Sequence, residues 1–271
     1  MDVYIKTNNK NVEDAEYYKD LLINVNSAWK SHYWIFMNFI RLKKPKVIVE
    51  LGTDRGFSLL SALYGLSKGN VDGKIYGIDA WGKDYEKNQN EIMKFGGRRL
   101  HELRNKTLPY LTEKYKLDES KAILKRNYFN EMIENFEDGS IDILHIDGNH
   151  DYNKVKRDYL GYKDKINLSD GVIFMHDVLR GKKMKENNIA EIDYNDTDNF
   201  GVFRLFNEIN MKKGYFTQHS GLGILTNNDK LLNVIEKLSK EMEIGYFKKK
   251  KCIWQKNDTF FRGNIPTDIL Y

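Results

Sequence analysis

The chain has 271 residues, of which 41% are hydrophobic and 31% are charged. These proportions fit a soluble globular protein with one large domain. The net charge is +5, and much of it lies in the run Lys248–Lys251. We expect a solvated surface there, because the interleaved aromatic and basic residues of a nucleic-acid-binding module are absent from the sequence. The single cysteine, Cys252, excludes a disulfide framework within the chain and favours a reducing compartment.

Neither a signal peptide nor a membrane span is visible in the sequence. The start, Met1–Lys10, lacks an apolar segment of the kind that a secretory signal needs. The longest apolar run, Trp34–Ile40, is interrupted by Asn38 and is far too short to cross a bilayer. We therefore expect a cytoplasmic protein.

Residues 1–45 are predicted to form an N-terminal helical extension. The first residues are polar, and from Val12 to about Leu42 the spacing of apolar and aromatic residues favours helices. The aromatic residues are expected to serve packing. Whether this segment also caps the substrate side of a site is left open by the sequence.

Strand and helix patterns then alternate five times. Strands are predicted at 46–51, 74–79, 122–125, 141–146 and 172–175, and the helices between them at 56–66, 83–118, 129–136 and 152–165. Such alternation favours a largely parallel, doubly wound sheet. Right-handed crossovers bring the carboxyl ends of these strands to one edge, where ligands bind.

The remainder of the chain predicts a less regular arrangement. A polar stretch to about residue 198 is expected to be a long loop. A helix (200–211), two strands (215–218 and 222–226), another helix (231–238) and a tail with possible short strands follow. We predict a Rossmann-like, doubly wound α/β fold, with a mostly parallel seven-stranded sheet and an antiparallel strand near the C-terminus. The main domain spans 46–226, and a C-terminal helix and basic tail (227–271) pack on it.

The stretch Lys46–Gly56 indicates the kind of cofactor. Its strand ends in Glu50 and turns through Gly52 and Gly56 into a helix. A dinucleotide site needs a third glycine, so that the backbone can approach a pyrophosphate. Here Asp54 lies inside the turn, and a carboxylate is a poor lining for a phosphate. The sulfonium and amino groups of S-adenosylmethionine fit this turn better.

A second acid supports an adenosyl ligand. Asp79 ends the second predicted strand, where a carboxylate can accept hydrogen bonds from both hydroxyls of a ribose. Ala80 and Trp81 would then flank the ribose or the adenine. The alternative is a generic α/β domain in which these acids only cap helices.

Four motifs in a fixed order resemble a known family. They read Val49-Glu-Leu-Gly-Thr-x-x-Gly-x-Ser58, Gly77-Ile-Asp-Ala-Trp81, Asp142-Ile-Leu-His-Ile-Asp-Gly-Asn-His-x-Tyr152 and Asp170-Gly-Val-Ile-x-x-His-Asp-Val178. The order resembles class I S-adenosylmethionine-dependent methyltransferases, and most of all the branch of macrocin-type sugar O-methyltransferases and cephalosporin-hydroxylase-like proteins. The resemblance covers about 46–226. It implies a cofactor site made by Glu50, Gly52, Thr53, Asp54, Gly56, Ser58, Asp79, Ala80, Trp81, Asn127 and Asp147.

The fourth and fifth strands carry the predicted chemistry. A sugar hydroxyl is a very weak acid, so methyl transfer to it needs a metal, a base or both. Asp147 and Asp177 follow neighbouring strands and can share a divalent cation. In the resembling sugar methyltransferases such acids bind the metal, and a histidine at the position of His150 is the base.

His176 departs from the pattern of this family, because it stands where an acid is the commoner metal ligand. The predicted metal ligands are therefore Asp147, His176 and Asp177. Imidazole suits Mn²⁺, Fe²⁺ or Zn²⁺ better than Mg²⁺. Either the metal is softer than Mg²⁺, or water replaces His176 as a ligand.

The predicted function is that of an S-adenosylmethionine-dependent, divalent-metal-assisted (Mg²⁺ or Mn²⁺) O-methyltransferase acting on a hydroxyl of a sugar or glycosylated substrate. The acceptor is expected to be a small molecule or a glycan. The resembling enzymes are often homo-oligomers, and we expect neither a nucleic-acid partner nor a membrane span. A catechol-type methyltransferase is an alternative, although such enzymes usually show Asp-Asn where this chain has His176-Asp177. A non-catalytic, cofactor-binding interaction protein is another, with residues 178–198 and Lys248–Lys251 as its surfaces. His150 and His176 could also be ordinary hydrogen-bonded residues, and His145 is expected in the core.

Overall fold

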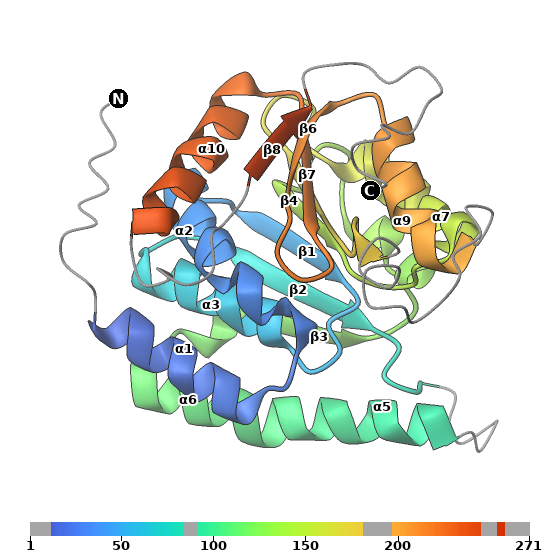
Figure 1. Cartoon of the computed structure of the whole chain (residues 1–271). Coiled ribbons are helices and arrows are strands. Elements are labelled where there is room, and N and C mark those ends of the chain that lie inside the picture. Colours follow the sequence, from blue (N-terminus) through green and yellow to red (C-terminus); the bar gives the residue numbers. More distant parts are fainter. Residues whose placement is uncertain (1–11, 84–90, 181–196, 245–253, 258–271) are drawn as a thin grey trace, which may run out of the picture.

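The computed structural model describes residues 12–83, 91–180, 197–244 and 254–257. Their centre is one sheet with helices on both faces (Figure 1). The strands lie in the order β3-β2-β1-β4-β5-β7-β6-β8. The first five in sequence are parallel to one another: β1 (Val47–Leu51), β2 (Lys74–Asp79), β3 (Ala122–Arg126), β4 (Ile143–Ile146) and β5 (Val172–His176).

The other three strands form the antiparallel end of the sheet. β7 (Leu222–Thr226) lies between β5 and β6 (Lys212–Phe216) and is antiparallel to both. β8 (Trp254–Asn257) pairs antiparallel with β6 at the edge. The predicted fold class is confirmed. The sheet has eight strands where seven were predicted, because β8 adds one more strand at its edge.

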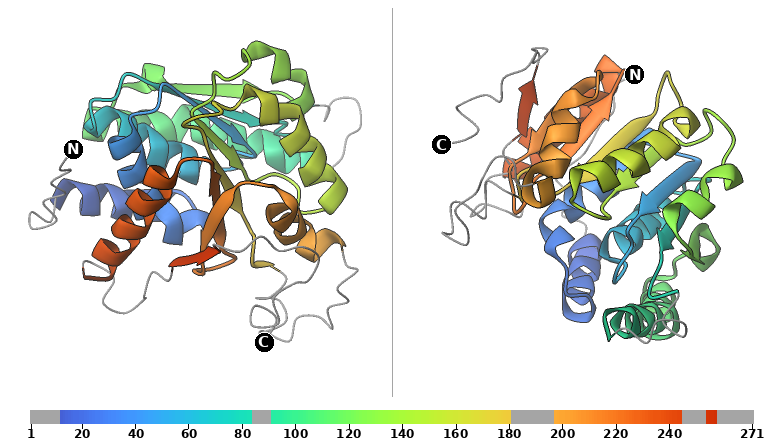
Figure 2. Two further views of the ribbon diagram at one scale, coloured as in Figure 1. Left: turned by 90° about the horizontal axis from the view of Figure 1, so that it is seen from above. Right: turned by 90° about the vertical axis from the view of Figure 1, so that its right-hand side faces the viewer.

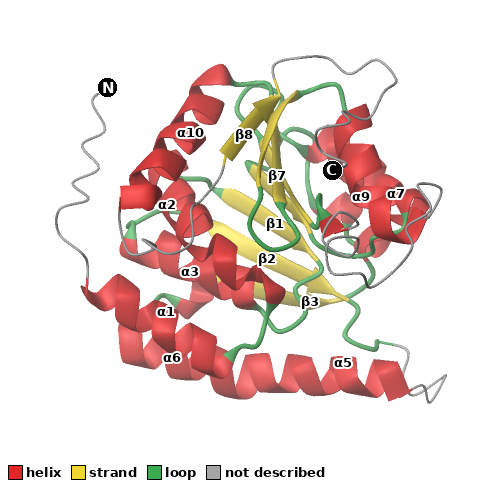
Figure 3. Cartoon of the chain, in the orientation of Figure 1, coloured by secondary structure: helices red, strands yellow, loops and turns green. Residues whose placement is uncertain are grey.

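Helices cover the two faces of the sheet and form two hydrophobic cores (Figures 2 and 3). One face carries α2 (Tyr33–Lys43), α3 (Phe57–Lys68) and α10 (Asp229–Ile244). The other carries α7 (Tyr152–Tyr162) and α9 (Thr197–Glu208). Outside the first group lie α1 (Val12–Asn24), α5 (Glu91–Glu102) and α6 (Leu108–Tyr115).

The N-terminal extension is packed into the first core. Between α1 and α2 lies a short 3₁₀ turn, Ala28–His32. Arg41 of α2 donates two hydrogen bonds to Asp14 of α1, of 2.8 and 2.9 Å. Tyr64 of α3 donates a third, of 2.7 Å, to the same carboxylate. The first two bonds join the two helices of the extension to each other, and the third joins the extension to α3. The predicted domain boundaries stay a prediction.

The helix predicted over 129–136 is wrong in detail. The chain forms two 3₁₀ turns there, Phe129–Glu131 and Ile133–Asn135. The carbonyl of Phe129 accepts a hydrogen bond from the Tyr162 hydroxyl at 2.8 Å, which ties the first turn to α7. The expected long loop lies largely outside the described residues, and the Lys248–Lys251 run lies wholly outside them.

Gly201 allows α9 and the start of α7 to come into close contact. A Cβ atom at Gly201 would lie 2.3 Å from the carbonyl oxygen of His150 and from the nitrogen of Tyr152. No side chain fits in that space, since real Cβ atoms keep a distance of at least 3.0 Å. The loop that carries His150 is therefore held against α9 by direct backbone packing.

Strand β6 begins earlier than the apolar pattern predicted, because Lys213 has a structural role. Its ammonium group donates hydrogen bonds to the carbonyl oxygens of Phe206, Asn207 and Ile209, at 2.7, 3.0 and 2.7 Å. These carbonyls lie at the C-terminal end of α9, where a cation is favoured by the unpaired oxygens and the helix dipole.

We predict that Lys213→Met lowers the free energy of unfolding by about 1–2 kcal/mol, because three carbonyls lose a charged donor. Urea unfolding followed by circular dichroism measures the loss. Lys212→Met is the matched control, since Lys212 is half-exposed and its ion pair with Asp229 lies at the surface. An equal effect of the two substitutions would contradict this role of Lys213.

Candidate active site

The site is built around the turn that follows β1. Gly52 has φ +99°, and a Cβ atom there would lie 2.2 Å from the carbonyl oxygen of Asp147. Glycine is required on both counts, by the left-handed backbone and by the approach of the chain after β4. The nitrogen of Asp147 donates to the carbonyl of Leu51 at 2.8 Å. The turn and the Asp147 loop therefore form one rigid floor.

Asp79 organises the neighbouring part of the floor. Its carboxylate accepts hydrogen bonds from the backbone nitrogens of Asp54 and Trp81, both at 2.9 Å. Burial raises the pKa of Asp79 although these two donors lower it. The Trp81 indole donates to the carbonyl of Asp54 at 2.7 Å, so the turns after β1 and β2 support each other.

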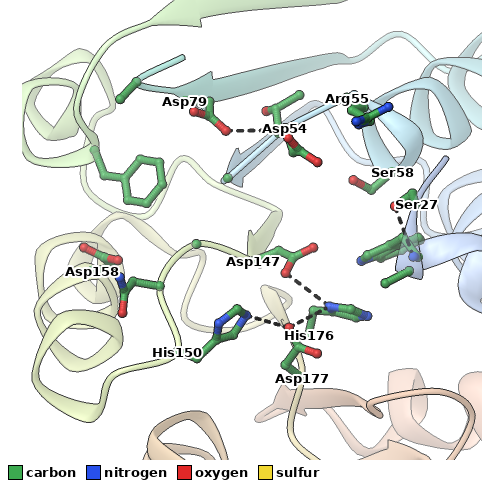
Figure 4. A pocket seen from close by; sticks show the side chains of 18 of the residues that line it. Ser27, Asp54, Arg55, Ser58, Asp79, Asp147, His150, Asp158, His176 and Asp177 are labelled. Atoms are coloured by element: carbon green, nitrogen blue, oxygen red, sulfur yellow. Dashed lines mark hydrogen bonds and ion pairs between the residues drawn. The ribbon is translucent and has the colours of Figure 1, made fainter. Parts of the chain in front are cut away.

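A cavity of about 780 Å³ opens above this floor, at the carboxyl edge of the parallel strands (Figure 4). Its wall holds groups of both signs: the carboxylates of Asp54, Asp79, Asp147, Asp158 and Asp177, and the cations of Arg55, Arg99, Lys154 and Arg157. The carboxylates are the groups that suit a cationic ligand. Most of the residues predicted for the site line this cavity: Gly52, Thr53, Asp54, Ser58, Asp79, Ala80, Asp147, His150, His176 and Asp177.

Four residues predicted to bind the cofactor do not line the cavity. Glu50 is fully buried below the turn, and Gly56 forms the N-terminal cap of α3. Trp81 is buried against the Asp54 backbone. The Asn127 amide accepts a hydrogen bond from Lys83 and donates one to the Met132 sulfur. Their predicted contacts with a cofactor remain predictions.

The acids and histidines at the ends of β4 and β5 form one cluster. His176 Nδ1 lies 3.1 Å from Asp147 Oδ1 and 3.3 Å from Asp177 Oδ2. His150 Nε2 lies 2.6 Å from Asp177 Oδ2 (Figure 4). Asp177 has φ +64°, a left-handed conformation that aspartate and asparagine tolerate better than most residues. This backbone turn places the Asp177 carboxylate between the two imidazoles.

The two carboxylates determine the charge of His176. Burial alone would lower the pKa of this imidazole, but Asp147 and Asp177 raise it to about 10. Burial would raise the pKa of Asp177, but the neighbouring His176 and His150 hold it well below its usual value. At neutral pH the cluster therefore contains an imidazolium between two carboxylates.

Three of these residues could hold a metal ion. Asp147, His150 and Asp177 each offer a ligand atom, and these atoms lie within 4.8 Å of one another. The set differs from the predicted one, which contained His176 and gave His150 the role of base. His176 directs its Nδ1 toward the carboxylates as a hydrogen-bond donor, in agreement with the alternative that it is not a ligand.

Parts of the wall come from residues that the sequence did not single out. The segment Asn26–Trp29 of the N-terminal extension lines the cavity, so the extension does border the candidate substrate side. Lys154, Arg157 and Asp158 of α7 line it as well. Their one sequence signal was the amphipathic pattern of α7, which does not tell a cavity-facing acid from a surface acid.

Asp158 is the least paired of the buried acids in this wall. It is 6% exposed, and its ion pair with Arg157 Nε is 3.7 Å long. Burial raises its pKa to about 6 although Arg157 acts in the opposite direction.

Comparison with known proteins shows what the core of this chain is similar to. Residues 49–178 match the family Methyltransf_24, whose model describes a methyltransferase domain. The matched segment contains the four motifs that resemble class I methyltransferases, so the match agrees with the expected enzyme class. The finer assignment to the macrocin-type branch is not part of this match.

One curated relative is 30% identical over 152 residues, the uncharacterised protein y4gI of Sinorhizobium fredii. The aligned segment is 56% of this chain but 15% of the relative, so the chain spans only a small part of the length of that protein.

Solved structures share the fold. An O-methyltransferase from Bacillus cereus in complex with SAH has a TM-score of 0.52 and 15% identity, covering 78% of this chain and 90% of that one. An SAH-bound methyltransferase from Podospora anserina has a TM-score of 0.50 and 14% identity, covering 80% of this chain and 88% of that one.

In the part of the chain that the structure describes, no helix has the length and apolar character needed to span a bilayer.

We predict that Asp158→Asn stabilises the protein by about 2 kcal/mol at pH 7.5 and has little effect at pH 4. The folded pKa of Asp158, about 6, lies above the unfolded value. The carboxyl group therefore destabilises the fold as pH rises from about 4 to 6, and the amide removes this cost. Urea unfolding at the two pH values measures the difference. A stabilisation of equal size at pH 4 would show that ionisation is not its cause.

Proposed function

We propose that this chain is an O-methyltransferase that transfers the methyl group of S-adenosylmethionine to a hydroxyl of a sugar or a glycosylated small molecule. The observation that carries the proposal is the His150–Asp177 pair, at 2.6 Å, in the wall of a cavity floored by a methyltransferase glycine turn. Such a pair can accept the proton that a hydroxyl must lose when it attacks the methyl group.

The floor of the cavity supports the choice of donor. Gly52 permits close backbone approach, and the Asp79 carboxylate keeps acceptor capacity for ribose hydroxyls beside its two backbone donors. The carboxylates of the wall suit the positive charges of the sulfonium and the ammonium group. Alignment of the acceptor oxygen with the methyl carbon is the main task left to the protein, because the sulfonium is already a good leaving group.

His150 is the group we assign to the acceptor hydroxyl. It is 28% exposed in its side chain and lines the cavity, whereas His176 is 3% exposed and directs its Nδ1 at two carboxylates. With Nε2 beside Asp177, the Nδ1 atom of His150 is left for a proton from the acceptor. Asp177 orients the ring and stabilises the imidazolium that results.

A divalent cation fits the same cluster and would replace the base. Asp147, Asp177 and His150 would hold it, which corresponds to the mixed oxygen and nitrogen set that favours Mn²⁺ over Mg²⁺. As a ligand, the neutral His150 ring would carry its hydrogen on the other nitrogen and would not accept the proton of the acceptor. A bound cation would lower the pKa of the acceptor hydroxyl. The cationic His176 opposes the binding of a second positive charge, and we expect a weak metal site for that reason.

A catechol-type activity is the competing proposal. It would use the same donor and the same cluster, with a planar phenol as acceptor. The assay that separates the two follows methyl transfer to a panel of catechols and a panel of sugars and glycosides. Turnover of catechols alone would overturn the sugar assignment while leaving the donor site intact.

We predict that calorimetry detects one S-adenosylhomocysteine per chain and that Asp79→Asn weakens binding about 10-fold, because one charged acceptor is lost. Asp142→Asn is the matched control. Asp142 also accepts two backbone N–H groups, from Lys46 and Val47, but at the other end of β1. If the wild-type protein does not bind at millimolar ligand, the proposed donor is wrong.

We predict that Asp177→Asn lowers Mn²⁺ affinity by about 100-fold and changes S-adenosylhomocysteine affinity less than threefold. Asparagine is chosen because it tolerates the left-handed backbone at this position, whereas alanine would add strain. Mn²⁺ binding is measured by electron paramagnetic resonance. Asp138→Asn, a change to an exposed carboxylate at the turn before β4, is the control. Unchanged Mn²⁺ binding in Asp177→Asn would exclude Asp177 as a ligand.

A further inference from the structure

A chain of buried hydrogen bonds runs from the N-terminal extension to the glycine turn. Trp29 Nε1 lies 3.1 Å from His145 Nε2, and His145 Nδ1 lies 3.0 Å from Glu50 Oε1. The Ser58 hydroxyl bonds the same Glu50 oxygen. The side chains of His145 and Glu50 are fully buried, and Trp29 is 1% exposed.

The indole N–H group of Trp29 determines which atom donates in each of these hydrogen bonds. An indole N–H can only donate, so His145 Nε2 must accept and cannot carry a hydrogen. The hydrogen of the neutral ring then lies on Nδ1, which donates to Glu50. A carboxylate can only accept, so Ser58 also donates to it. The one hydroxyl hydrogen of Ser58 is thereby used, and toward the cavity that oxygen offers lone pairs alone.

Two further oxygens near the turn have no partner among the described residues, Glu50 Oε2 and Thr53 Oγ1. Thr53 is 3% exposed and lines the cavity together with Ser58. Buried oxygens without a partner carry a free-energy cost unless a ligand supplies the missing donor. Of the two, Glu50 Oε2 lies below the turn and outside the cavity, whereas the Thr53 hydroxyl lines the cavity and can accept or donate. Beside Thr53, the Ser58 oxygen is the group that Glu50 restricts to accepting, and an ammonium group supplies the donor that it lacks.

We propose that Trp29 and His145 are positioning residues for the methyl donor, since they fix the Nδ1–H tautomer of His145 and keep Glu50 and Ser58 as hydrogen-bond acceptors below the turn. Neither residue belongs to the glycine turn, and Trp29 lies outside the segment that matches the methyltransferase family. The functional part of the proposal rests on the proposed function, because it assumes that the ligand is an ammonium-bearing adenosyl donor.

Losing the bond between His145 and Glu50 would change how Ser58 is held. Without the His145 N–H group, the buried Glu50 carboxylate has one donor fewer and is no longer held in place from the side of β4. The Ser58 hydroxyl, which bonds the same oxygen, then loses its fixed acceptor. Its lone pairs no longer face the cavity in a defined direction, and an ammonium group would lose an acceptor there.

Two substitutions at His145 separate positioning from mere packing. His145→Asn keeps an amide N–H near the position of Nδ1, so it can still donate to Glu50 but cannot accept from Trp29. His145→Gln extends its amide to the position of Nε2, so it can accept from Trp29 but leaves Glu50 without its donor. Both remove a buried ring, and we expect similar losses of thermal stability.

The experiment combines nuclear magnetic resonance with calorimetry. A long-range ¹H–¹⁵N correlation spectrum of the ligand-free protein shows which ring nitrogen of each histidine carries a hydrogen, and the His145→Asn spectrum identifies the His145 signals. We expect the Nδ1–H tautomer in the wild type. In Trp29→Phe we expect the Nε2 resonance of His145 to shift, because that nitrogen loses its hydrogen-bond donor, while Glu50 still accepts from Nδ1. Tyr33→Phe is the control from the same extension, because the buried Tyr33 hydroxyl has no hydrogen-bond partner among the described residues.

For ligand binding, we expect His145→Gln to weaken S-adenosylhomocysteine affinity about 10-fold more than His145→Asn does. Equal losses of affinity in the two variants would show that His145 acts through packing alone and would overturn the proposal. An Nε2–H tautomer in the wild type would also overturn it. If the wild type binds no S-adenosylhomocysteine, the proposed function fails, while the tautomer assignment is still decided by the spectrum.

Discussion

The close approach of Gly52 to the carbonyl of Asp147 is the constraint on which the site depends. It brings the loops after β1 and β4 into direct backbone contact, so the glycine turn and the acid cluster share one floor. A side chain at position 52 would separate these loops. The distance between the glycine turn and the acid cluster is therefore set by the sheet and not by flexible side chains.

Charge in this site is balanced internally. His176 lies between Asp147 and Asp177, and the three groups together keep the charge of the buried cluster near minus one. A buried pair of carboxylates without such a partner would be costly, since desolvation disfavours both charges. The imidazolium thus supplies a counter-charge that lies within hydrogen-bonding distance of both carboxylates.

Much of this arrangement could be predicted from the sequence. Alternating apolar runs predicted the parallel sheet, and acids at strand ends predicted the cluster, because both signals are local. The two histidines show the limit: spacing brought His150 and His176 to one edge but could not tell which ring faces the carboxylates. Trp29 was missed because its contact with His145 joins segments far apart in the chain, and no local pattern records such a contact. Asp158 was missed because the amphipathic pattern of α7 does not tell an acid in a cavity wall from one at the surface.

The packing at Gly201 has a mechanical consequence. The backbone of α9 touches the backbone at 150–152 with no side chain between them to yield. A shift of α9 along its axis would therefore reach the His150 ring directly, without first deforming the sheet. Movement of α9 would therefore be transmitted to His150, the group that we assign to the acceptor. The contact is close because Gly201 has no Cβ atom.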